Sequence, residues 1–321
     1  MDFPILLKNQ INALCDGVSL SELSQNSSHL SETYRGSRIG KERLLQTSKQ
    51  ALVYAVTRMP ATFGAIAETL EKISAIYDFN PQTMLDVGAG TGACGWAAES
   101  FFDLQKLVCL EREDVMRSLG QSLMKESDIP LLQQSQWQTF DLIKDELPSK
   151  ADLVTASYIL NELHDAYQEK AILKLWQATE QVLLIVEPGT PKVFANLLKL
   201  RDILLQAGAY VIAPCPHQQK CPLKNDDWCH FSARIARSRL HRQAKSAEMG
   251  YEDEKYCYMA FSHQPLSFSY QRILKKPMIT KAEVAFDICS FDGKNNVEKI
   301  SVKNKSMYKK AKKLAWGDIL A

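Results

Sequence analysis

The chain has 321 residues, of which 45% are hydrophobic and 24% charged, so it is long enough for about two domains and too apolar to be disordered throughout. Its net charge of +2 conceals an uneven distribution, because residues 215–321 hold 20 Lys and Arg against 11 Asp and Glu, and the remainder holds 19 against 26. A basic segment on an acidic body is typical of proteins that bind nucleic acid, although a solvated lysine face gives the same counts.

No apolar run approaches the roughly 20 residues that span a bilayer, and the opening MDFPILLKNQ lacks the basic and apolar regions of a signal peptide. We therefore expect a cytoplasmic protein that has no membrane partner and is monomeric. Thiols stay reduced in that compartment, so the eight cysteines are not expected to form a disulfide framework.

Residues 1–80 are expected to form a helical layer. Between residues 41 and 73, apolar side chains such as Leu44, Leu52 and Val56 recur at spacings of three and four, which is typical of amphipathic helices. Pro60 predicts a break between two helices. Arg58 lies just before that break, and the sequence leaves open whether it is a surface residue or reaches a ligand.

Residues 81–214 alternate between apolar strands and helices, which predicts an α/β fold with a mostly parallel, doubly wound sheet. Strands are expected within 83–90, 106–113, 151–160 and 181–190, with helices between them and a further helix and strand within 192–216. Residues 215–321 are expected to form a third region, in which a cysteine-rich loop and a basic helix precede several short antiparallel strands.

A glycine-rich turn, LDVGAGTGACGWAA, follows the first strand and opens a helix. Gly88, Gly90 and Gly92 let the main chain turn tightly, so that the N–H groups at the start of the helix face a ligand. Asp86 precedes the turn. Glu111 ends the next strand, where an acidic side chain holds the hydroxyl pair of a ribose. The turn therefore predicts a nucleotide-like cofactor, and the alternative is a turn that holds no ligand.

The spacing G-x-G-x-G favours S-adenosylmethionine over NAD, whose pyrophosphate cradle has the spacing G-x-G-x-x-G. In this register the turn resembles the first motif of class I methyltransferases. Asp141 would then lie beside the adenine. Ser157 opens the stretch SYILNEL, which would follow the fourth strand of that fold and face the methyl group.

Catalytic residues are harder to assign. The stretch SYILNEL after the fourth strand contains neither the N/D-P-P-Y/F sequence of amine methyltransferases nor a cysteine nucleophile. Glu162 or His164 could act as a general base, although either could be a helix-surface residue. Cys94 and Cys109 are interpreted as core thiols.

Three cysteines, Cys215, Cys221 and Cys229, lie in a loop rich in polar residues and proline. In a reducing compartment such a cluster predicts metal ligands. A fourth ligand is needed, and the candidates are His217, His230, Cys257 and Cys289. Zinc would accept cysteine with histidine, whereas an iron–sulfur cluster prefers four thiolates, and the spacing does not separate these two.

The stretch HFSARIARSRLHRQAK follows this loop and is predicted to be a basic helix that binds RNA phosphates. The residues expected to contact the RNA are Arg234, Arg237, Arg239, Arg242 and Lys245. A second, weaker basic patch is KNKSMYKKAKK near the C-terminus.

Several of these stretches together resemble a known family. They are YAVTRMPATFGA, LDVGAGTGA, PCPHQQKCPLKNDDWCHFSARIAR and DICSFDG, followed by Tyr308, Ala311 and the WGD of residues 316–318. The chain resembles the methyltransferase-like family of the small ribosomal subunit, which includes mitochondrial small-subunit assembly factors and bacterial relatives. The match extends from Arg58 to Asp318, and the cysteine block is its most specific part.

The resemblance implies a class I methyltransferase domain with a small, mostly β C-terminal extension. It implies a [4Fe–4S] cluster on four cysteines, of which three match Cys215, Cys221 and Cys229 and the fourth falls at Cys289, which leaves Cys257 as a packing residue. It also implies binding to small-subunit rRNA and methyl transfer. A non-catalytic assembly factor that keeps the cofactor fold is the alternative.

Overall fold

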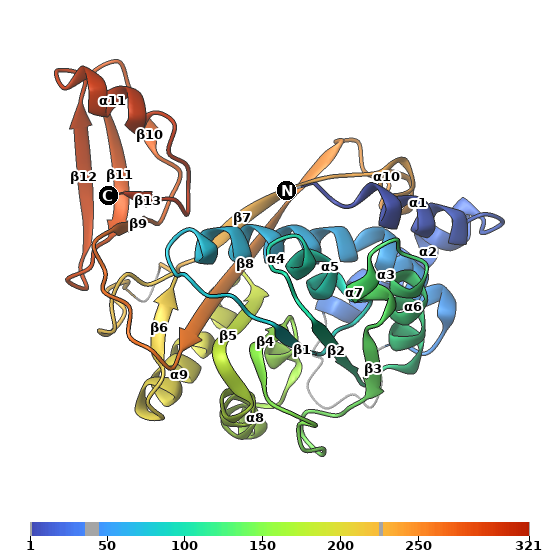
Figure 1. The fold of residues 1–321 in the computed structure, drawn as a ribbon. Helices are drawn as coiled ribbons and strands as arrows, with labels where there is room; N and C mark the ends of the chain where they lie inside the picture. The colour runs from blue at the N-terminus through green and yellow to red at the C-terminus, as the bar shows by residue number, and fades with distance from the viewer. Residues whose placement is uncertain (1, 36–44, 225–226, 321) are drawn as a thin grey trace.

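The computed structural model describes residues 2–35, 45–224 and 227–320, and within them it contains a large mixed sheet and a smaller second sheet (Figure 1). Seven strands of the large sheet follow the order β3-β2-β1-β4-β5-β8-β6, and β7 pairs with β8. These strands are β1 (Thr83–Val87), β2 (Lys106–Glu111), β3 (Gln136–Thr139), β4 (Ala151–Ser157), β5 (Thr179–Pro188), β6 (Tyr210–Ala213), β7 (Phe231–Ala236) and β8 (Tyr251–Ser262).

Strands β1 to β5 run parallel to one another, and they are nearly continuous apolar runs because helices cover both faces of the sheet. One face packs against α4 (Met59–Ser74) and α5 (Ala93–Glu99), and the other against α8 (Asp165–Gln177) and α9 (Pro191–Gln206) (Figure 1). The shorter connections contain α6 (Asp114–Lys125), α7 (Pro130–Gln133) and the 3₁₀ helix η1 (Leu160–Glu162).

Strand β8 distinguishes this sheet from the all-parallel dinucleotide-binding fold. It lies between β5 and β6 and is antiparallel to both. A parallel 3-2-1-4-5 series followed by one inserted antiparallel strand is the arrangement of class I methyltransferases, so the predicted α/β class is confirmed.

The N-terminal region is helical, as predicted, and contains α1 (Ile5–Leu14), α2 (Leu20–Arg35), α3 (Ser48–Thr57) and α4. Thr47 begins α3 with a capping box that it forms with Gln50. Pro60 lies in the first turn of α4, where a missing N–H leaves no bond unmade, and this explains the break at Arg58. Leu44 and the rest of residues 41–44 of the predicted helical stretch lie outside the described residues.

The C-terminal strands differ from the expected arrangement. Strands β7 and β8 join the large sheet, so the small sheet begins only at Gln271, whereas the whole of residues 215–321 was expected to form the extension. How the chain divides into independently folding domains stays a prediction. The small sheet contains β9 (Gln271–Ile273), β10 (Met278–Ile279), β11 (Glu283–Cys289), β12 (Asn295–Ser301) and β13 (Ile319–Leu320), with α11 (Lys305–Ala311) beside β12.

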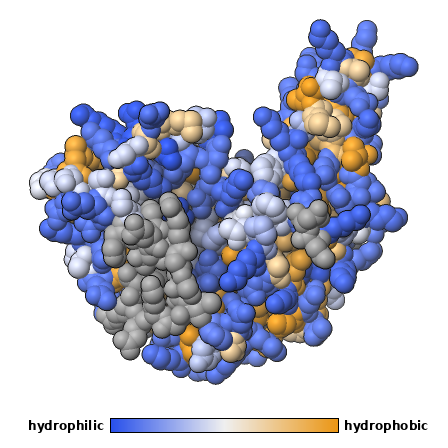
Figure 2. All heavy atoms as spheres, turned by 180° about the vertical axis from the view of Figure 1, so that it is seen from behind, coloured by the Kyte–Doolittle hydropathy of each residue, from blue (hydrophilic) through white to orange (hydrophobic). Residues whose placement is uncertain are grey.

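The small sheet projects from the body as a lobe with its own apolar core, in which Ile273, Val284 and Phe286 are fully buried (Figures 1 and 2). Figure 2 shows that the surface of this lobe is largely hydrophilic, with a patch of hydrophobic residues. Residues 263–321 hold 12 Lys and Arg against 5 Asp and Glu, so the lobe contains much of the basic excess of the chain. No helix in the described ranges is long and apolar enough to cross a membrane.

Candidate functional site

The glycine turn lies at the carboxyl end of β1, at the edge where the parallel strands of such sheets bind ligands. Gly88 has a φ of +73°, and a Cβ atom there would lie 2.6 Å from Cδ1 of Ile159, so only glycine fits. Gly92 is the N-cap of α5 and packs against Met124 instead of facing the cleft.

A cleft of about 1160 Å³ opens above this edge of the sheet. It brings together seven of the residues predicted for the cofactor or for catalysis, which are Gly88, Gly90, Glu111, Asp141, Ser157, Glu162 and His164. Because these residues come from four separate strand ends and the segments after them, their convergence is a property of the fold rather than of one motif.

Glu111 is the most constrained carboxylate of the cleft. Its two oxygens each accept a main-chain N–H at 2.7 Å, one from Gly90 and one from Glu113. Burial raises its pKa above the usual value. The side chain is therefore held in place at the end of β2 before any ligand binds, and its remaining lone pairs suit hydroxyl donors.

Asp86 does not line the cleft. It is buried beneath the turn, where it accepts a hydrogen bond from Oγ1 of Thr155 at 2.8 Å and thereby joins β1 to β4. Burial raises the pKa of this carboxyl to about 7. Its role in the structure is to support the turn rather than to contact a ligand.

The two catalytic candidates both line the cleft. His164 is the N-cap of α8, and its Nδ1 accepts the N–H of Ala166 at 3.2 Å, so only Nε2 remains for other chemistry. Glu162 lies in η1. The loop that carries both is held by a buried carboxyl, Glu187, which accepts the N–H of Leu160 at 2.8 Å and whose pKa burial raises to about 8.

Two tyrosines of the cleft wall, Tyr54 and Tyr158, were not expected from the sequence. Tyr158 has a φ of +60°, which is strained for an aromatic residue, and its hydroxyl donates to Oε1 of Glu254 at 3.2 Å. Arg58 contacts the same oxygen at 3.3 Å. Arg58 therefore supports the cleft wall from behind through Glu254, and no local sequence signal pointed to this carboxylate of β8.

The predicted basic helix over residues 230–245 is wrong. Residues 231–236 form β7 and only Arg239–Ala244 form a helix, α10. The reason is an alternation of period two, in which Phe231, Ala233 and Ile235 are buried while the residues between them are not. The five cations therefore do not share one helix face.

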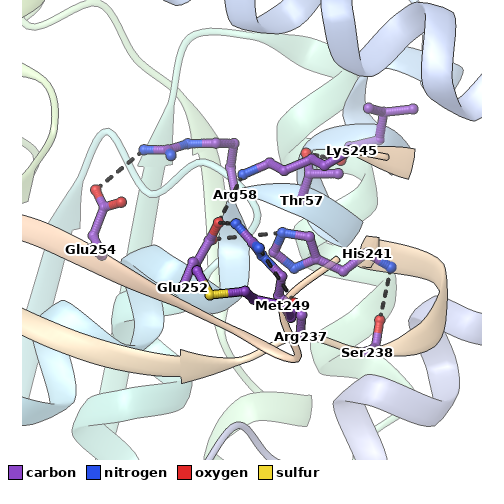
Figure 3. Close-up of polar contacts among 10 residues, drawn as sticks. Thr57, Arg58, Arg237, Ser238, His241, Lys245, Met249, Glu252 and Glu254 are labelled. Atoms are coloured by element: carbon purple, nitrogen blue, oxygen red, sulfur yellow. Dashed lines mark hydrogen bonds and ion pairs between the residues drawn. The ribbon is translucent and has the colours of Figure 1, made fainter. Parts of the chain in front are cut away.

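Three of these five cations are paired with acidic residues of β8. Figure 3 shows Glu252 facing Arg237, His241 and Lys245, with its carboxylate 2.9 Å from Nη2 of Arg237 and 3.2 Å from Nζ of Lys245. Arg234 makes two hydrogen bonds to Asp253, at 2.7 and 2.8 Å. Arg239 and Arg242 are exposed, and no acidic residue of the described ranges pairs with either.

The cysteine loop leaves the edge of β8 and returns to it. Strand β6 pairs with residues 260–262 of β8 and β7 with residues 251–256, both on the side opposite β5. Residues 214–230 thus form the loop that connects β6 to β7, two strands that pair with the same side of β8. Cys215 lies at the start of this loop and Cys229 at its end. The described part of this loop contains no helix or strand of its own.

All four predicted ligands, Cys215, Cys221, Cys229 and Cys289, line one small cavity. Cys257 does not line it, and its Sγ donates to the carbonyl of Pro188 at 3.4 Å instead. His217 is buried, with Nε2 3.2 Å from Sγ of Cys289. Burial raises the pKa of all four thiols, and neighbouring thiols raise it further at Cys221, Cys229 and Cys289.

In the part of the chain that is described, no three His, Cys, Asp or Glu side chains lie close enough to hold a single metal ion. The four thiols nevertheless line one shared cavity. Its other walls are mostly apolar and come from α9, β8 and the small sheet, including Phe194, Leu198, Met259 and Leu274.

Comparison with solved structures gives a distant relative of this fold. The magnesium protoporphyrin IX methyltransferase of Synechocystis PCC 6803, solved with bound S-adenosylmethionine, has 13% sequence identity and a TM-score of 0.44. The alignment covers 77% of this chain and 100% of that one.

Comparison with curated proteins gives nearer relatives. The mitochondrial ribosome assembly protein METTL17 of Homo sapiens is 27% identical over 303 residues, which cover 87% of this chain and 64% of the human protein. The mitochondrial Rsm22-cox11 tandem protein 2 of Schizosaccharomyces pombe is 22% identical over 334 residues, covering 85% of this chain and 43% of the yeast protein. This chain therefore spans about two fifths to just under two thirds of the length of these relatives.

Both relatives are named as mitochondrial proteins, whereas the cytoplasmic location expected for this chain stays a prediction. The family described as mitochondrial small ribosomal subunit Rsm22 matches residues 48–321, which is most of the chain and includes the cleft, the cysteine loop and the small sheet. The chain belongs to the Rsm22 family of the mitochondrial small ribosomal subunit.

Proposed function

We propose that this protein binds S-adenosylmethionine in the cleft and acts on the assembling small ribosomal subunit or its rRNA. The observation that carries the cofactor is the convergence of Gly88, Glu111, Asp141 and Ser157 on one cleft. In this assignment Glu111 accepts the ribose hydroxyls, Asp141 lies beside the adenine, and the glycine turn leaves room for the methionine part.

A specific observation favours the second candidate function, a non-catalytic assembly factor. His164 already uses Nδ1 as a helix cap, and the segment after β4 carries no recognisable methyltransferase motif. If methyl transfer occurs, the nucleophile must lose a proton, and Glu162 is then the best-placed carboxylate.

Two measurements on the purified chain separate these functions. Calorimetric titration with S-adenosylmethionine tests the cofactor, and transfer of labelled methyl groups to small-subunit rRNA, naked or partly assembled, tests catalysis. Binding without methyl incorporation, together with unchanged rRNA methylation after gene deletion, supports the assembly factor. Absence of binding would sink both the methyltransferase and the cofactor assignment.

We further propose that the cysteine cavity holds a [4Fe–4S] cluster on Cys215, Cys221, Cys229 and Cys289. The donor set fits, because four thiols line one mostly apolar cavity and an iron–sulfur cluster prefers four thiolates. When bound, the group would cross-link the loop of residues 214–230 to β11 and so supply folding free energy that the loop lacks.

The chain offers a matched control for this assignment. Cys289→Ser should lose the iron and sulfide of protein purified without oxygen, whereas Cys257→Ser, in a neighbouring buried thiol outside the cavity, should retain both. Protein that contains one zinc ion and responds to neither substitution would refute the cluster.

The proposed contact with rRNA moves from a basic helix to two exposed groups of cations. Arg239 and Arg242 lie on α10, and the second group lies on the C-terminal lobe, where Lys309 and Lys310 belong to the last turn of α11. Both groups remain available for phosphate, whereas Arg237 and Lys245 are committed to Glu252.

A further inference from the structure

Two arginines beside the cysteine cavity are almost completely buried. Arg201 on α9 and Arg272 on β9 are each 1% exposed, and they are among the largest fully buried side chains of the chain. Arginine is rarely buried to this extent unless an opposite charge compensates it. The partners of these two guanidinium groups therefore need to be accounted for.

Arg201 lies on the same stripe of α9 as Phe194 and Leu198, both of which line the cavity. Its Nη2 donates to the carbonyl of Gln219 at 2.7 Å, in the cysteine loop, while its Nε has no partner. The nearest carboxylate, that of Asp202 at 3.4 Å, is 63% exposed and so compensates a buried charge poorly.

Arg272 lines the cavity directly. Its Nε donates to the carbonyl of Pro214 at 3.1 Å and its Nη1 to that of Gly317 at 2.8 Å, whereas its Nη2 is buried without a partner. Within the described residues no carboxylate lies at ion-pair distance from this guanidinium. Two carbonyl dipoles hold its position, but its charge has no counter-ion.

In the β7–β8 hairpin the chain compensates a partly buried cation with a carboxylate. Arg237 is 15% exposed and is paired with Glu252 at 2.9 Å. The cavity thus differs from the β7–β8 hairpin in having buried cations that lie beside thiols instead of a buried carboxylate. Neutral thiols would leave the two buried charges uncompensated, which is unfavourable in a low-dielectric interior.

We propose that Arg201 and Arg272 are the counter-charges of the group that the four cysteines bind. This inference rests on the cluster proposed above. Four thiolates on a [4Fe–4S]²⁺ core have two net negative charges, which two guanidinium groups balance within the low-dielectric interior. Both arginines are positioning residues, since neither is a ligand.

Two properties of the bound group should then depend on these charges. The first is retention, because a compensated dianion is harder to extract from an apolar cavity. The second is the reduction potential, because adding an electron raises the negative charge, and nearby cations favour that change. A purely structural role, in which the arginines only bind carbonyls, predicts neither.

The test compares glutamine and lysine at each position, Arg201→Gln with Arg201→Lys and Arg272→Gln with Arg272→Lys, in the full chain purified without oxygen. Glutamine keeps a donor for the carbonyls but loses the charge, and lysine keeps both. Arg239→Gln, an exposed arginine, is the control. The readouts are iron per chain, the rate of iron loss to a chelator, and the midpoint potential in a titration with dithionite.

We expect the glutamine variants to lose iron roughly 10- to 100-fold faster than wild type and to have a lower midpoint potential, with lysine close to wild type. Equal behaviour of glutamine and lysine would overturn the inference. Should the glutamine variants fail to fold, the lysine variants decide, since iron loss from them at the accelerated rate also overturns it.

The same experiment distinguishes this inference from the cluster itself. Wild-type protein that contains zinc refutes the iron–sulfur assignment, while zinc release from the glutamine and lysine variants still tests the arginines. Wild-type protein that contains no metal refutes both, because the two cations would then have no group to balance.

Discussion

The cofactor cleft and the cysteine cavity satisfy their polar groups in opposite ways. In the cleft, the main chain supplies the hydrogen-bond partners, since the Glu111 carboxylate accepts one N–H from Gly90 and one from Glu113. At the cavity, four thiols lie beside two buried arginines, and no carboxylate among the described residues lies at ion-pair distance from Arg272. The main chain satisfies Glu111 without a ligand, whereas Arg272 of the cavity has no counter-ion among the described residues.

The difference follows from how the chain builds each site. The cleft lies on the rigid ends of parallel strands, whose geometry the core fixes. The cavity lies between a loop that leaves the edge of β8 and a separate small sheet, so fewer contacts hold its walls. Binding of a metal group in such a place would also contribute free energy to the folding of the loop.

Removal of the proposed cluster should therefore give the largest effect. After chelation we expect amide protection in β9, β11 and the described part of residues 214–230 to fall roughly 1000-fold or more, which is about 4.1 kcal/mol. Strands β1 to β5 should keep their protection. Hydrogen exchange with mass spectrometry measures the protection of both regions. Unchanged protection in the loop would show that the fold of the loop does not depend on a bound group.

The β7–β8 hairpin provides a comparison, because its partly buried Arg237 is compensated by the carboxylate of Glu252. Glu252→Gln removes the carboxylate shared by Arg237 and Lys245, so we expect a loss of about 3 kcal/mol in the free energy of unfolding. Asp253→Asn, on the exposed neighbour of the same strand, should cost less than about 1 kcal/mol. Denaturant unfolding checks both, and equal losses would contradict the distinction.

The same carboxylate predicts a dependence on pH. Contact with His241, Lys245 and Arg237 holds the pKa of Glu252 below its usual value despite burial. Its contribution to stability is therefore complete above the unfolded pKa of about 4.3 and is lost as the pH falls below it. Glu252→Gln should flatten the acid limb of the stability profile measured against wild type.

How far the sequence anticipates each site depends on whether its signal is local. Gly88 and Glu111 belong to one strand–turn–helix unit, so their spacing predicted their convergence. Tyr158 and Glu254 are 96 residues apart and meet only because β8 enters the sheet beside β5. No local pattern announces such a pairing.

The sequence contained signals for two features that were not predicted, the strand β7 and the buried Arg201. The alternation of Phe231, Ala233 and Ile235 indicates a strand, but the density of arginines drew the prediction towards a helix. Arg201 interrupts a stripe of buried apolar residues on α9, and a cation in that position is itself a sign of a buried charged partner. Neither reading requires the structure.

In the cleft, a single carboxylate should control the affinity for the cofactor. Glu111→Gln should weaken S-adenosylmethionine binding by roughly 10- to 100-fold, because the ribose loses a charged acceptor. Glu169→Gln, on the exposed face of α8, is the control and should bind as wild type does. Calorimetric titration measures the affinity, and wild-type affinity in the Glu111 variant would place the ribose elsewhere.

The smallest expected effect concerns RNA, and it tests whether free and paired cations differ in function. Replacement of both Arg239 and Arg242 by glutamine should leave stability within about 0.5 kcal/mol of wild type, since both are exposed. It should reduce the slope of log affinity against log salt by roughly 1.5 for a small-subunit rRNA fragment.

The control is a cation that is already paired. Arg237→Gln should lower stability with little change in that slope, because the Arg237 guanidinium is paired with Glu252. An unchanged slope in the double variant, together with a reduced slope in Lys309→Gln and Lys310→Gln, would move the RNA contact from α10 to the C-terminal lobe.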